Sequence, residues 1–119
     1  MPSIADQNEE YKDDDKANAS QRASALLKAM GNKHRLMILC HLSETEACVT
    51  ALERVVGLSQ SALSQHLAKL RNEHLVKTRR HAQTIYYSLS GPVASEVIKA
   101  LRSSECDPCK SEPEPEPQD

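Results

Sequence analysis

The spacing of the apolar residues changes once along the chain, and this change limits the possible folds more than any other feature. Before His74 apolar side chains recur every three or four residues, as they do on one face of an α-helix. Beyond that point they alternate with polar residues, so Ile85, Tyr87 and Leu89 share one face of a strand. The sequence therefore predicts a mainly α fold with one β-hairpin, in the order α-α-α-α-β-β-α.

Local signals divide the first part into helices. An apolar stripe over residues 23–30 ends at Gly31, which suits a helix C-terminus. The segment 36–42 is apolar nearly all round, which predicts a central buried helix. Thr50 and Glu53 have the spacing of a capping box, which places the start of a third helix there.

The remaining elements also have recognisable boundaries. The third helix is expected to end at Gly57, and Ser59 is expected to cap a fourth. A hairpin follows over residues 75–89, with its turn at 81–83. Pro92 suits the first position of a last helix, which is expected to fray near its C-terminus.

Charge is distributed unevenly along the chain, although the total is only −2. Residues 17–104 hold twelve Lys or Arg against five Asp or Glu, a net charge of +7. The acidic segments 1–16 and 107–119 hold few large apolar side chains, so both are expected to be disordered. Within the first of them, residues 11–16 resemble an engineered epitope tag. The folded domain is therefore expected to span 17–106, and its positive charge favours a nucleic-acid partner.

The composition excludes several functions. The three Gly lie far apart, so the chain has no Gly-rich phosphate loop. Three Tyr, with no Phe and no Trp, provide no stacking platform for single-stranded nucleic acid. Because no nucleophile motif or carboxylate pair has a recognisable context, neither enzymatic activity nor a cofactor is expected. No stretch approaches the roughly 18 apolar residues of a membrane span, and no secretory leader is visible, so the expected location is the cytoplasm.

Two short helices separated by residues 57–59 are typical of a helix-turn-helix. The second helix is expected to present uncharged donors and acceptors on one face, at Gln60, Ser61, Ser64 and Gln65. Such side chains suit base edges in the major groove of DNA, whereas Lys and Arg suit phosphates. Basic residues follow on the end of that helix and on the hairpin, at Lys69, Arg71, Lys77, Arg79 and Arg80. A basic hairpin after such a helix is typical of a winged helix-turn-helix.

The segment Gln60–Arg71 (QSALSQHLAKLR) closely resembles the recognition helix of the ArsR/SmtB family of bacterial winged-helix repressors. Thr84–Ser90 resembles the second wing strand of that family, and Lys28–Leu42 resembles its second-helix region. The resemblance covers about residues 20–106. It implies a homodimer in the bacterial cytoplasm, with the first and last helices packed across the two-fold axis. Such a dimer binds double-stranded DNA at an imperfect inverted repeat.

The resemblance also assigns residues to the DNA interface. Positions of the recognition helix match the family's base-contacting positions, and residues 80–84 match its wing tip. The chain departs from the family pattern in two places. His74 stands where many members have Gly, and a left-handed backbone is possible for His but less favourable. The turn at 81–83 has no Gly, so it is expected to be longer or differently shaped. The expected DNA-binding residues are Gln60, Ser61, Ser64, Gln65, Lys69, Arg71, Arg79, Arg80, Gln83 and Thr84.

The four cysteines do not complete a metal site of the kinds that this family uses. Where some members have Cys-x-Cys on the third helix, the chain has Cys48 followed by Val49 and Thr50. A site on the last helix uses Asp and His, and neither occurs in residues 92–102. Because soft metals need convergent thiolates or imidazoles, no bound metal is expected.

Cys40 and Cys106 instead resemble, in position and spacing, the cysteine pair of the BigR/SqrR/HlyU branch, which responds to persulfides and oxidants. The resemblance implies that a disulfide or polysulfide between these two cysteines lowers operator affinity and derepresses the target genes. One thiolate attacks the persulfide or peroxide, and the second thiol resolves the product. Cys109 is an alternative second thiol, and Cys48 is expected to take no part.

Two other functions fit the same residues. One is a metal-responsive repressor of the same fold that uses Cys106, Cys109 and a histidine. The other is a DNA-binding module without a sensor, which acts as an antirepressor by competing with a silencing protein at promoters. Release of DNA by zinc or cadmium distinguishes the first, and DNA binding that ignores both oxidants and metals distinguishes the second.

Overall fold

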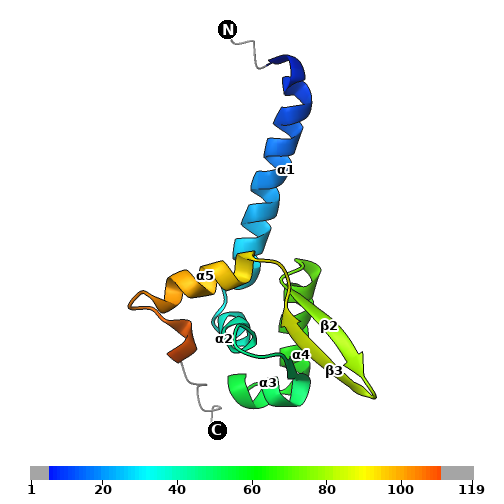
Figure 1. Ribbon diagram of the computed structural model, residues 1–119, viewed down its shortest axis with the longest axis vertical. Coiled ribbons are helices and arrows are strands. Elements are labelled where there is room, and N and C mark those ends of the chain that lie inside the picture. The colour runs from blue at the N-terminus through cyan, green and yellow to red at the C-terminus, as the bar shows by residue number, and fades with distance from the viewer. Residues whose placement is uncertain (1–5, 111–119) are drawn as a thin grey trace.

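The computed structural model describes the backbone of residues 6–110 and the side chains of residues 18–110. This part of the chain forms a helical body with a small antiparallel sheet at its side (Figure 1). The elements in chain order are α1 (Asp6–Met30), α2 (Lys33–Leu42), β1 (Ala47–Cys48), α3 (Val49–Val56), α4 (Gln60–Asn72), β2 (Val76–His81), β3 (Thr84–Leu89), α5 (Val93–Arg102) and the short 3₁₀ helix η1 (Pro108–Lys110). The predicted mainly α fold with a hairpin is confirmed.

Helix α2 forms the centre of the core. It begins after Asn32, whose side-chain oxygen accepts hydrogen bonds from the N–H groups of His34 and Arg35. The helix contacts α1, α3, α4, α5, β3 and η1, so its apolar side chains are covered on every side. Burying a side chain of this size stabilises the fold by about 1.5–3 kcal/mol. The buried residues of α2 are Met37, Ile38, Leu39, Cys40 and Leu42, as predicted for a central helix.

Local signals set the ends of the two helices of the helix-turn-helix. Gly57 has a φ of 70°, in the left-handed region, and ends α3 as predicted. Ser59 Oγ accepts a hydrogen bond from the N–H of Ala62 and caps α4, also as predicted. The apolar face of α4 is buried in the core at Leu63, Leu67 and Leu70.

The start of α3 differs from the prediction. The helix begins at Val49, and Cys48 occupies the N-cap position without a side-chain cap bond, so Thr50 and Glu53 do not form the predicted capping box. The reason is that Ala47 and Cys48 form a strand, β1, which pairs antiparallel with β3, and the chain passes from the sheet directly into the helix. A strand of two residues is too short to show an alternating pattern in the sequence.

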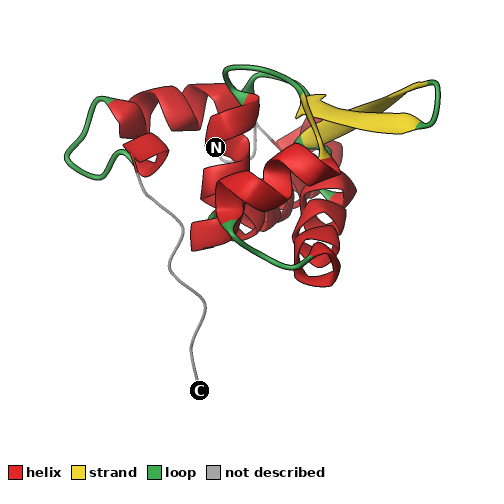
Figure 2. Cartoon of the chain, turned by 90° about the horizontal axis from the view of Figure 1, so that it is seen from below, coloured by secondary structure: helices red, strands yellow, loops and turns green. Residues whose placement is uncertain are grey.

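The hairpin forms a wing that extends from the helical body (Figures 1 and 2). Strands β2 and β3 pair along their whole length, which leaves Ala82 and Gln83 as a two-residue turn. This turn is shorter than the predicted turn at 81–83, and it is closed without glycine. Ala82 has a φ of 58°, a backbone conformation that costs a non-glycine residue roughly 1–2 kcal/mol. His74 has a φ of 60° just beyond α4, so it adopts the left-handed backbone that was considered possible there.

Helix α1 begins earlier than the predicted domain boundary at residue 17. It runs from Asp6 and projects away from the rest of the molecule (Figure 1), so the expected disorder of residues 1–16 does not hold from Asp6 onward. The segment 6–30 contains neither Gly nor Pro, and nothing in its sequence stops the helix. The expected disorder of residues 1–5 lies outside the described residues.

The C-terminal boundary also lies beyond the predicted one at residue 106. After α5 the chain reverses and forms η1, which contacts both α2 and α5, so residues 107–110 are part of the folded domain. The expected disordered tail over 111–119 lies outside the described residues. Within residues 6–110, none of the helices has the length and apolar character needed to cross a membrane.

Arg35 joins three helices. Its Nε donates a hydrogen bond to the carbonyl oxygen of Ala29 at the end of α1, and one terminal nitrogen lies 3.2 Å from Nδ1 of His66 in α4. The ring of His34 lies 5.6 Å from the ring of His66. Burial lowers the pKa of His66 below its ordinary value of 6.5, and the charges of Arg35, His34 and Lys69 lower it further.

We expect His66→Gln to remove part of the pH dependence of folding stability. Because the pKa of His66 is lower in the folded chain, the unfolded chain binds more protons as the pH falls below the ordinary value of 6.5. The wild type should therefore lose stability on that side, whereas Gln keeps an acceptor for Arg35 and does not titrate. Urea unfolding at about pH 7.5 and about pH 5.5 measures the difference in the free energy of unfolding.

The control is His81→Gln, which changes an exposed histidine at the end of strand β2. This variant should lose stability at the acidic pH as the wild type does. If the free energy of unfolding of His66→Gln falls between the two pH values by as much as that of the wild type, the lowered pKa of His66 does not contribute to stability.

Candidate nucleic-acid interface and cysteine pair

The solvent face of α4 carries the four side chains that the sequence predicts to contact bases. Gln60, Ser61, Ser64 and Gln65 are all exposed, and they lie opposite the leucines that bury the other face of the helix. The capping bond of Ser59 fixes the start of α4. The predicted base-contacting side chains of the first turn lie at the surface and not in the core. The helix therefore presents a row of uncharged donors and acceptors, which is what the edges of DNA bases require.

Basic side chains lie around this row. Lys69 and Arg71 are exposed near the end of α4, and Arg80 is exposed on the wing. Gln83 and Thr84 are exposed at the wing turn. A groove between α4 and the wing is lined by residues of both elements, including Ser64, Arg71, Asn72 and Tyr87. All ten predicted DNA-binding side chains are thus at the surface, on α4 and on the adjoining wing.

Arg79 differs from the other predicted contacts because it already has an anionic partner. Its Nε lies 3.1 and 3.0 Å from the two carboxylate oxygens of Glu46, and a terminal nitrogen also contacts that carboxylate. Its guanidinium carbon lies 4.6 Å from the ring centre of Tyr86. The hydrogen bond from Arg79 lowers the pKa of Glu46 and raises that of Arg79. A phosphate must therefore compete with Glu46 for this side chain.

Nothing in the sequence singles out Glu46, because its position depends on how β1 pairs with the wing. Strand β1 lies next to β3, with Cys48 opposite Tyr86, and Arg79 lies opposite Tyr86 on the other side. The residue just before β1 is therefore brought to the base of the wing. Since β1 itself could not be predicted, neither could this ion pair.

The cysteine pair is not the expected Cys40–Cys106 but the alternative that the sequence left open, with Cys109 as the second thiol. Cys40 in α2 forms a disulfide with Cys109 in η1, with their Cα atoms 5.4 Å apart, and Cys106 is exposed and unpaired. The reason is the path of the chain after α5. The N–H of Cys106 is bonded to Ser104 Oγ in an outward loop, whereas Asp107 Oδ1 accepts a bond from the N–H of Cys109 and starts the turn that packs against α2.

A small cavity of about 100 Å³ adjoins the disulfide. It lies between α2, α3 and η1, and its walls include Met37, His41, Glu44 and Val55. His41 is therefore beside the cysteine pair, whereas the ring of His34 lies next to the ring of His66 in α4. Cys48, at the start of α3, is half-buried and unpaired.

Asp107 is a further residue that the sequence did not single out. One of its carboxylate oxygens and the sulfur atoms of Cys40 and Cys109 all lie within 4.8 Å of one another. Among the residues that the structure describes, this is the group whose donors converge closely enough to hold a metal ion. The sequence grouped Cys106 and Cys109, which have Cys-x-x-Cys spacing, with a histidine as a possible metal site. In the fold these two cysteines are separated.

The predicted DNA-contacting surface of α4 and the wing, called the reading surface below, and the cysteine pair lie on opposite sides of the molecule. Figures 1 and 2 both show the wing at one end and η1, folded back beside α5, at the other. Helix α2 lies between them and contacts both α4 and η1. An effect of the cysteines on the reading surface must therefore pass through α2 or through an interface formed by α5.

Comparison with known proteins supports the assignment of the fold. Residues 32–78 match the family described as "Bacterial regulatory protein, arsR family". The chain is 52% identical over 87 residues to the nodulation protein NolR of Rhizobium meliloti, covering 73% of this chain and 71% of that protein. It is 49% identical over 87 residues to the transcriptional activator HlyU of Vibrio cholerae, with coverage of 73% and 81%. A biofilm growth-associated repressor of Xylella fastidiosa is 36% identical over 93 residues, with coverage of 78% and 82%.

Solved structures agree with these relatives. Reduced HlyU from Vibrio cholerae superimposes with a TM-score of 0.71 at 47% identity, covering 77% of this chain and 97% of that one. A homodimeric winged helix-turn-helix DNA-binding domain from Mycobacterium bovis superimposes with a TM-score of 0.69 at 27% identity, with coverage of 74% and 82%. The relatives are regulators and not enzymes, in agreement with the prediction. The chain therefore belongs to the arsR family of bacterial regulatory proteins and is a DNA-binding transcription regulator with a winged helix-turn-helix fold.

Proposed function

We propose that the chain is a homodimeric repressor that binds an imperfect inverted repeat in double-stranded DNA and releases it when a thiol switch closes. The observation that carries the DNA-binding part is the exposed face of α4, with uncharged side chains in the first turns and Lys69 and Arg71 behind them. The observation that carries the switch is the link between Cys40 and Cys109. The repressor acts on DNA in the bacterial cytoplasm.

The proposed contacts divide into two kinds. Gln60, Ser61, Ser64 and Gln65 contact base edges in the major groove and determine which sequence is bound. Lys69, Arg71, Arg80 and the wing turn contact phosphates and determine affinity at a given salt concentration. Arg79 joins the second group only when it leaves Glu46, so its contribution is smaller than that of Arg80.

The proposed dimer uses α1 and α5. Leu27 in α1 is 60% exposed and Val93 in α5 is 40% exposed, although both are large apolar residues. Apolar side chains that form one exposed patch commonly mark an interaction surface, and the proposed dimer brings these two helices together. Two copies related by a two-fold axis present two recognition helices, which suits two half-sites about one helical turn of DNA apart. Small changes at α5 then alter the spacing of the two reading surfaces.

The proposed inducer is a reactive sulfur species or an oxidant. With a peroxide, one thiolate attacks an oxygen and breaks the O–O bond, which gives a sulfenic acid and releases water or an alcohol once the leaving oxygen is protonated. The second thiol then displaces water from the sulfenic acid to give the disulfide. With an organic persulfide, one thiol takes the outer sulfur and releases the organic thiol, and the second cysteine then displaces hydrogen sulfide. Two persulfidated cysteines condense to a trisulfide and also release hydrogen sulfide.

The mechanical consequence follows from where the two cysteines lie. Cys40 is in the central helix, and Cys109 is in the turn that also contacts α5. In the dithiol form, η1 is held to α2 by packing alone. Closing the bond fixes η1 against α2 and favours one position of α5, which is part of the proposed dimer interface. An allosteric coupling of this kind is typically worth 1–3 kcal/mol.

We expect Gln65→Ala and Lys69→Ala to affect DNA binding differently. Loss of a base contact should weaken binding to the operator by about 1–3 kcal/mol and leave binding to random duplex nearly unchanged. Loss of a phosphate contact should weaken both and reduce the slope of log affinity against log salt by about one. Fluorescence anisotropy measures both effects, with an operator selected from a random DNA pool by the wild type.

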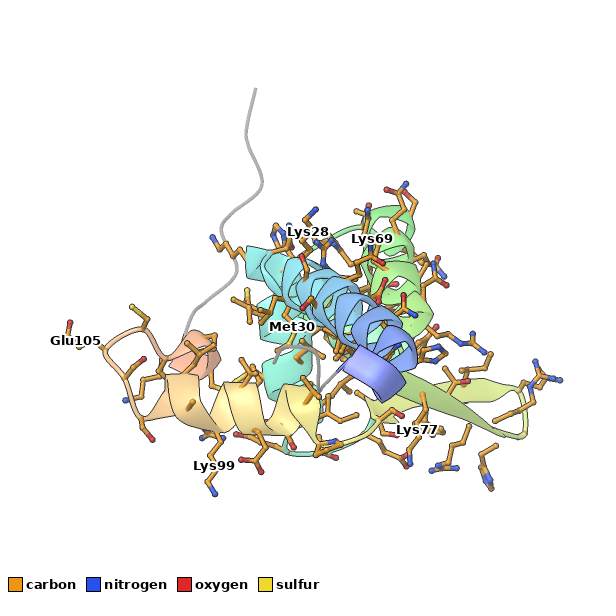
Figure 3. All side chains as sticks on the ribbon, turned by 90° about the horizontal axis from the view of Figure 1, so that it is seen from above. Lys28, Met30, Lys69, Lys77, Lys99 and Glu105 are labelled. Atoms are coloured by element: carbon orange, nitrogen blue, oxygen red, sulfur yellow. A yellow bond between two sulfur atoms is a disulfide. The ribbon has the colours of Figure 1, made fainter. Side chains whose placement is uncertain are left out.

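The matched control is Lys99→Ala. Lys99 projects from α5 away from α4 and the wing (Figure 3), so its loss should change neither the affinity nor the salt slope. Equal losses of operator affinity in the Lys69 and Lys99 variants would contradict the proposed DNA interface.

We expect Cys40→Ser and Cys109→Ser to bind the operator as the reduced wild type does, and to keep that affinity after treatment with persulfide or peroxide. The treated wild type should bind about 5- to 150-fold more weakly, the range of a typical allosteric coupling. Cys106→Ser is the control and should still respond, because Cys106 lies outside the pair. If Cys106→Ser loses the response and Cys109→Ser keeps it, the proposed pairing is wrong.

A further inference from the structure

The disulfide region contains a third donor that the thiol switch does not use. The carboxylate of Asp107 has an oxygen within 4.8 Å of both Cys40 Sγ and Cys109 Sγ. Asp107 is half-buried, and Cys40 is only 4% exposed, so the group lies at the boundary between core and solvent. The three donors come from two separate elements, α2 and the turn that ends in η1. Besides accepting the hydrogen bond from the N–H of Cys109, this carboxylate places an oxygen near both sulfurs.

We propose that the reduced chain binds one thiophilic divalent cation, of the zinc or cadmium type, through Cys40 Sγ, Cys109 Sγ and the Asp107 carboxylate. This site is separate from the proposed DNA interface and does not depend on it. It also differs from the set of Cys106, Cys109 and a histidine considered from the sequence. In the fold Cys106 is exposed in an outward loop, whereas Cys109 faces α2.

The donor set suits such a cation. Zinc binds cysteine sulfur at about 2.3 Å and carboxylate oxygen at about 2.0–2.2 Å, usually with tetrahedral geometry. Two sulfurs on one tetrahedral ion lie about 3.8 Å apart, a separation set by these bond lengths. The Cα atoms of the two cysteines are 5.4 Å apart. Once the disulfide is reduced, the two sulfurs therefore need only move apart to the separation that the ion sets.

The surroundings of the site leave room for a fourth ligand. The cavity of about 100 Å³ beside the two cysteines is large enough for a water molecule, and His41 lies in its wall. The hydrogen bond from the N–H of Cys109 to Asp107 Oδ1, 2.8 Å long, fixes the carboxylate close to the second sulfur. Such a bond orients a ligand before the ion arrives.

The same two sulfurs cannot form a disulfide and bind a metal at once. A dithiol reductant gives two electrons and two protons to the disulfide, which yields two thiols and the oxidised reductant. Binding of the cation then releases the two thiol protons. Conversely, an oxidant that takes two electrons from the bound thiolates forms the disulfide and releases the ion. Metal binding and oxidation are therefore mutually exclusive in each protomer.

The test is a titration of the full chain with Cd²⁺ after reduction by a dithiol and removal of the reductant under argon. The ultraviolet charge-transfer absorption of cadmium–thiolate bonds reports the number of sulfur ligands, and competition with a chromophoric chelator gives the affinity for Zn²⁺. The reduced wild type should bind one ion per protomer with the absorption of two thiolates. The protein oxidised beforehand should bind none at this site.

Three variants and one control identify the ligands. Cys40→Ser and Cys109→Ser should each lose the two-thiolate absorption. Asp107→Asn keeps an oxygen acceptor for the N–H of Cys109 but removes the anion. It should weaken Zn²⁺ binding by at least about tenfold, because losing even a residue that only supports a metal ligand typically weakens binding that much. Cys106→Ser, which changes an exposed cysteine three residues away, should bind as the wild type does.

Several results would overturn the site. Binding by the oxidised chain that equals binding by the reduced chain would do so without the use of any variant. Loss of the absorption in Cys106→Ser would move the site to the other cysteine pair, and unchanged Zn²⁺ affinity in Asp107→Asn would remove the carboxylate from it. Because none of these measurements involves DNA, their failure leaves the proposed repressor function untouched.

Discussion

The burial of helix α2 on all sides is the constraint on which the rest of the structure depends. Its apolar residues, Met37 to Leu42, contact every other layer of the fold, and a helix of this composition is stable only when it is covered all round. The covering elements are the ones that carry function. Helix α4 packs its leucines against the core and turns its polar face outward. On the other side, α5 and the C-terminal turn pack near Cys40.

This arrangement would let a chain of 119 residues couple the proposed DNA-contacting surface to the proposed thiol switch at a distance. The wing and the cysteine pair lie at opposite ends of the molecule (Figure 1), with α2 between them. Arg35 adds a polar connection on the reading side, since it joins the end of α1 to His66 in α4. A change beside Cys40 therefore acts on a helix that already supports α4 directly.

Much of the fold could be predicted because it follows from local rules. Gly57 and Ser59 end and start helices through their own backbone and side-chain bonds, and the exposed face of α4 follows from the 3.6-residue period. The left-handed backbone of His74 occurs where many members of the family have glycine, so the comparison with the family pattern marked this position as unusual.

The misses at β1 and at the cysteine pair share a physical cause, which is contact between segments distant in the sequence. Strand β1 exists only because Ala47 and Cys48 meet β3, and its pairing displaced the capping box and created the Glu46–Arg79 ion pair. The cysteine pairing depends on how the chain reverses after α5, which no periodicity encodes. Cys106 and Cys109 are three residues apart, yet one faces solvent and the other reaches α2.

The account rests most directly on which two cysteines are joined when the protein meets its inducer. The decisive measurement is mass spectrometry of peptides from the full chain, digested without reduction after exposure to an organic persulfide or to peroxide. The account predicts a crosslinked species that contains Cys40 and Cys109, as a plain disulfide after peroxide and as a disulfide or a trisulfide after persulfide. A crosslink between Cys40 and Cys106, or the absence of any crosslink at Cys40, would contradict it.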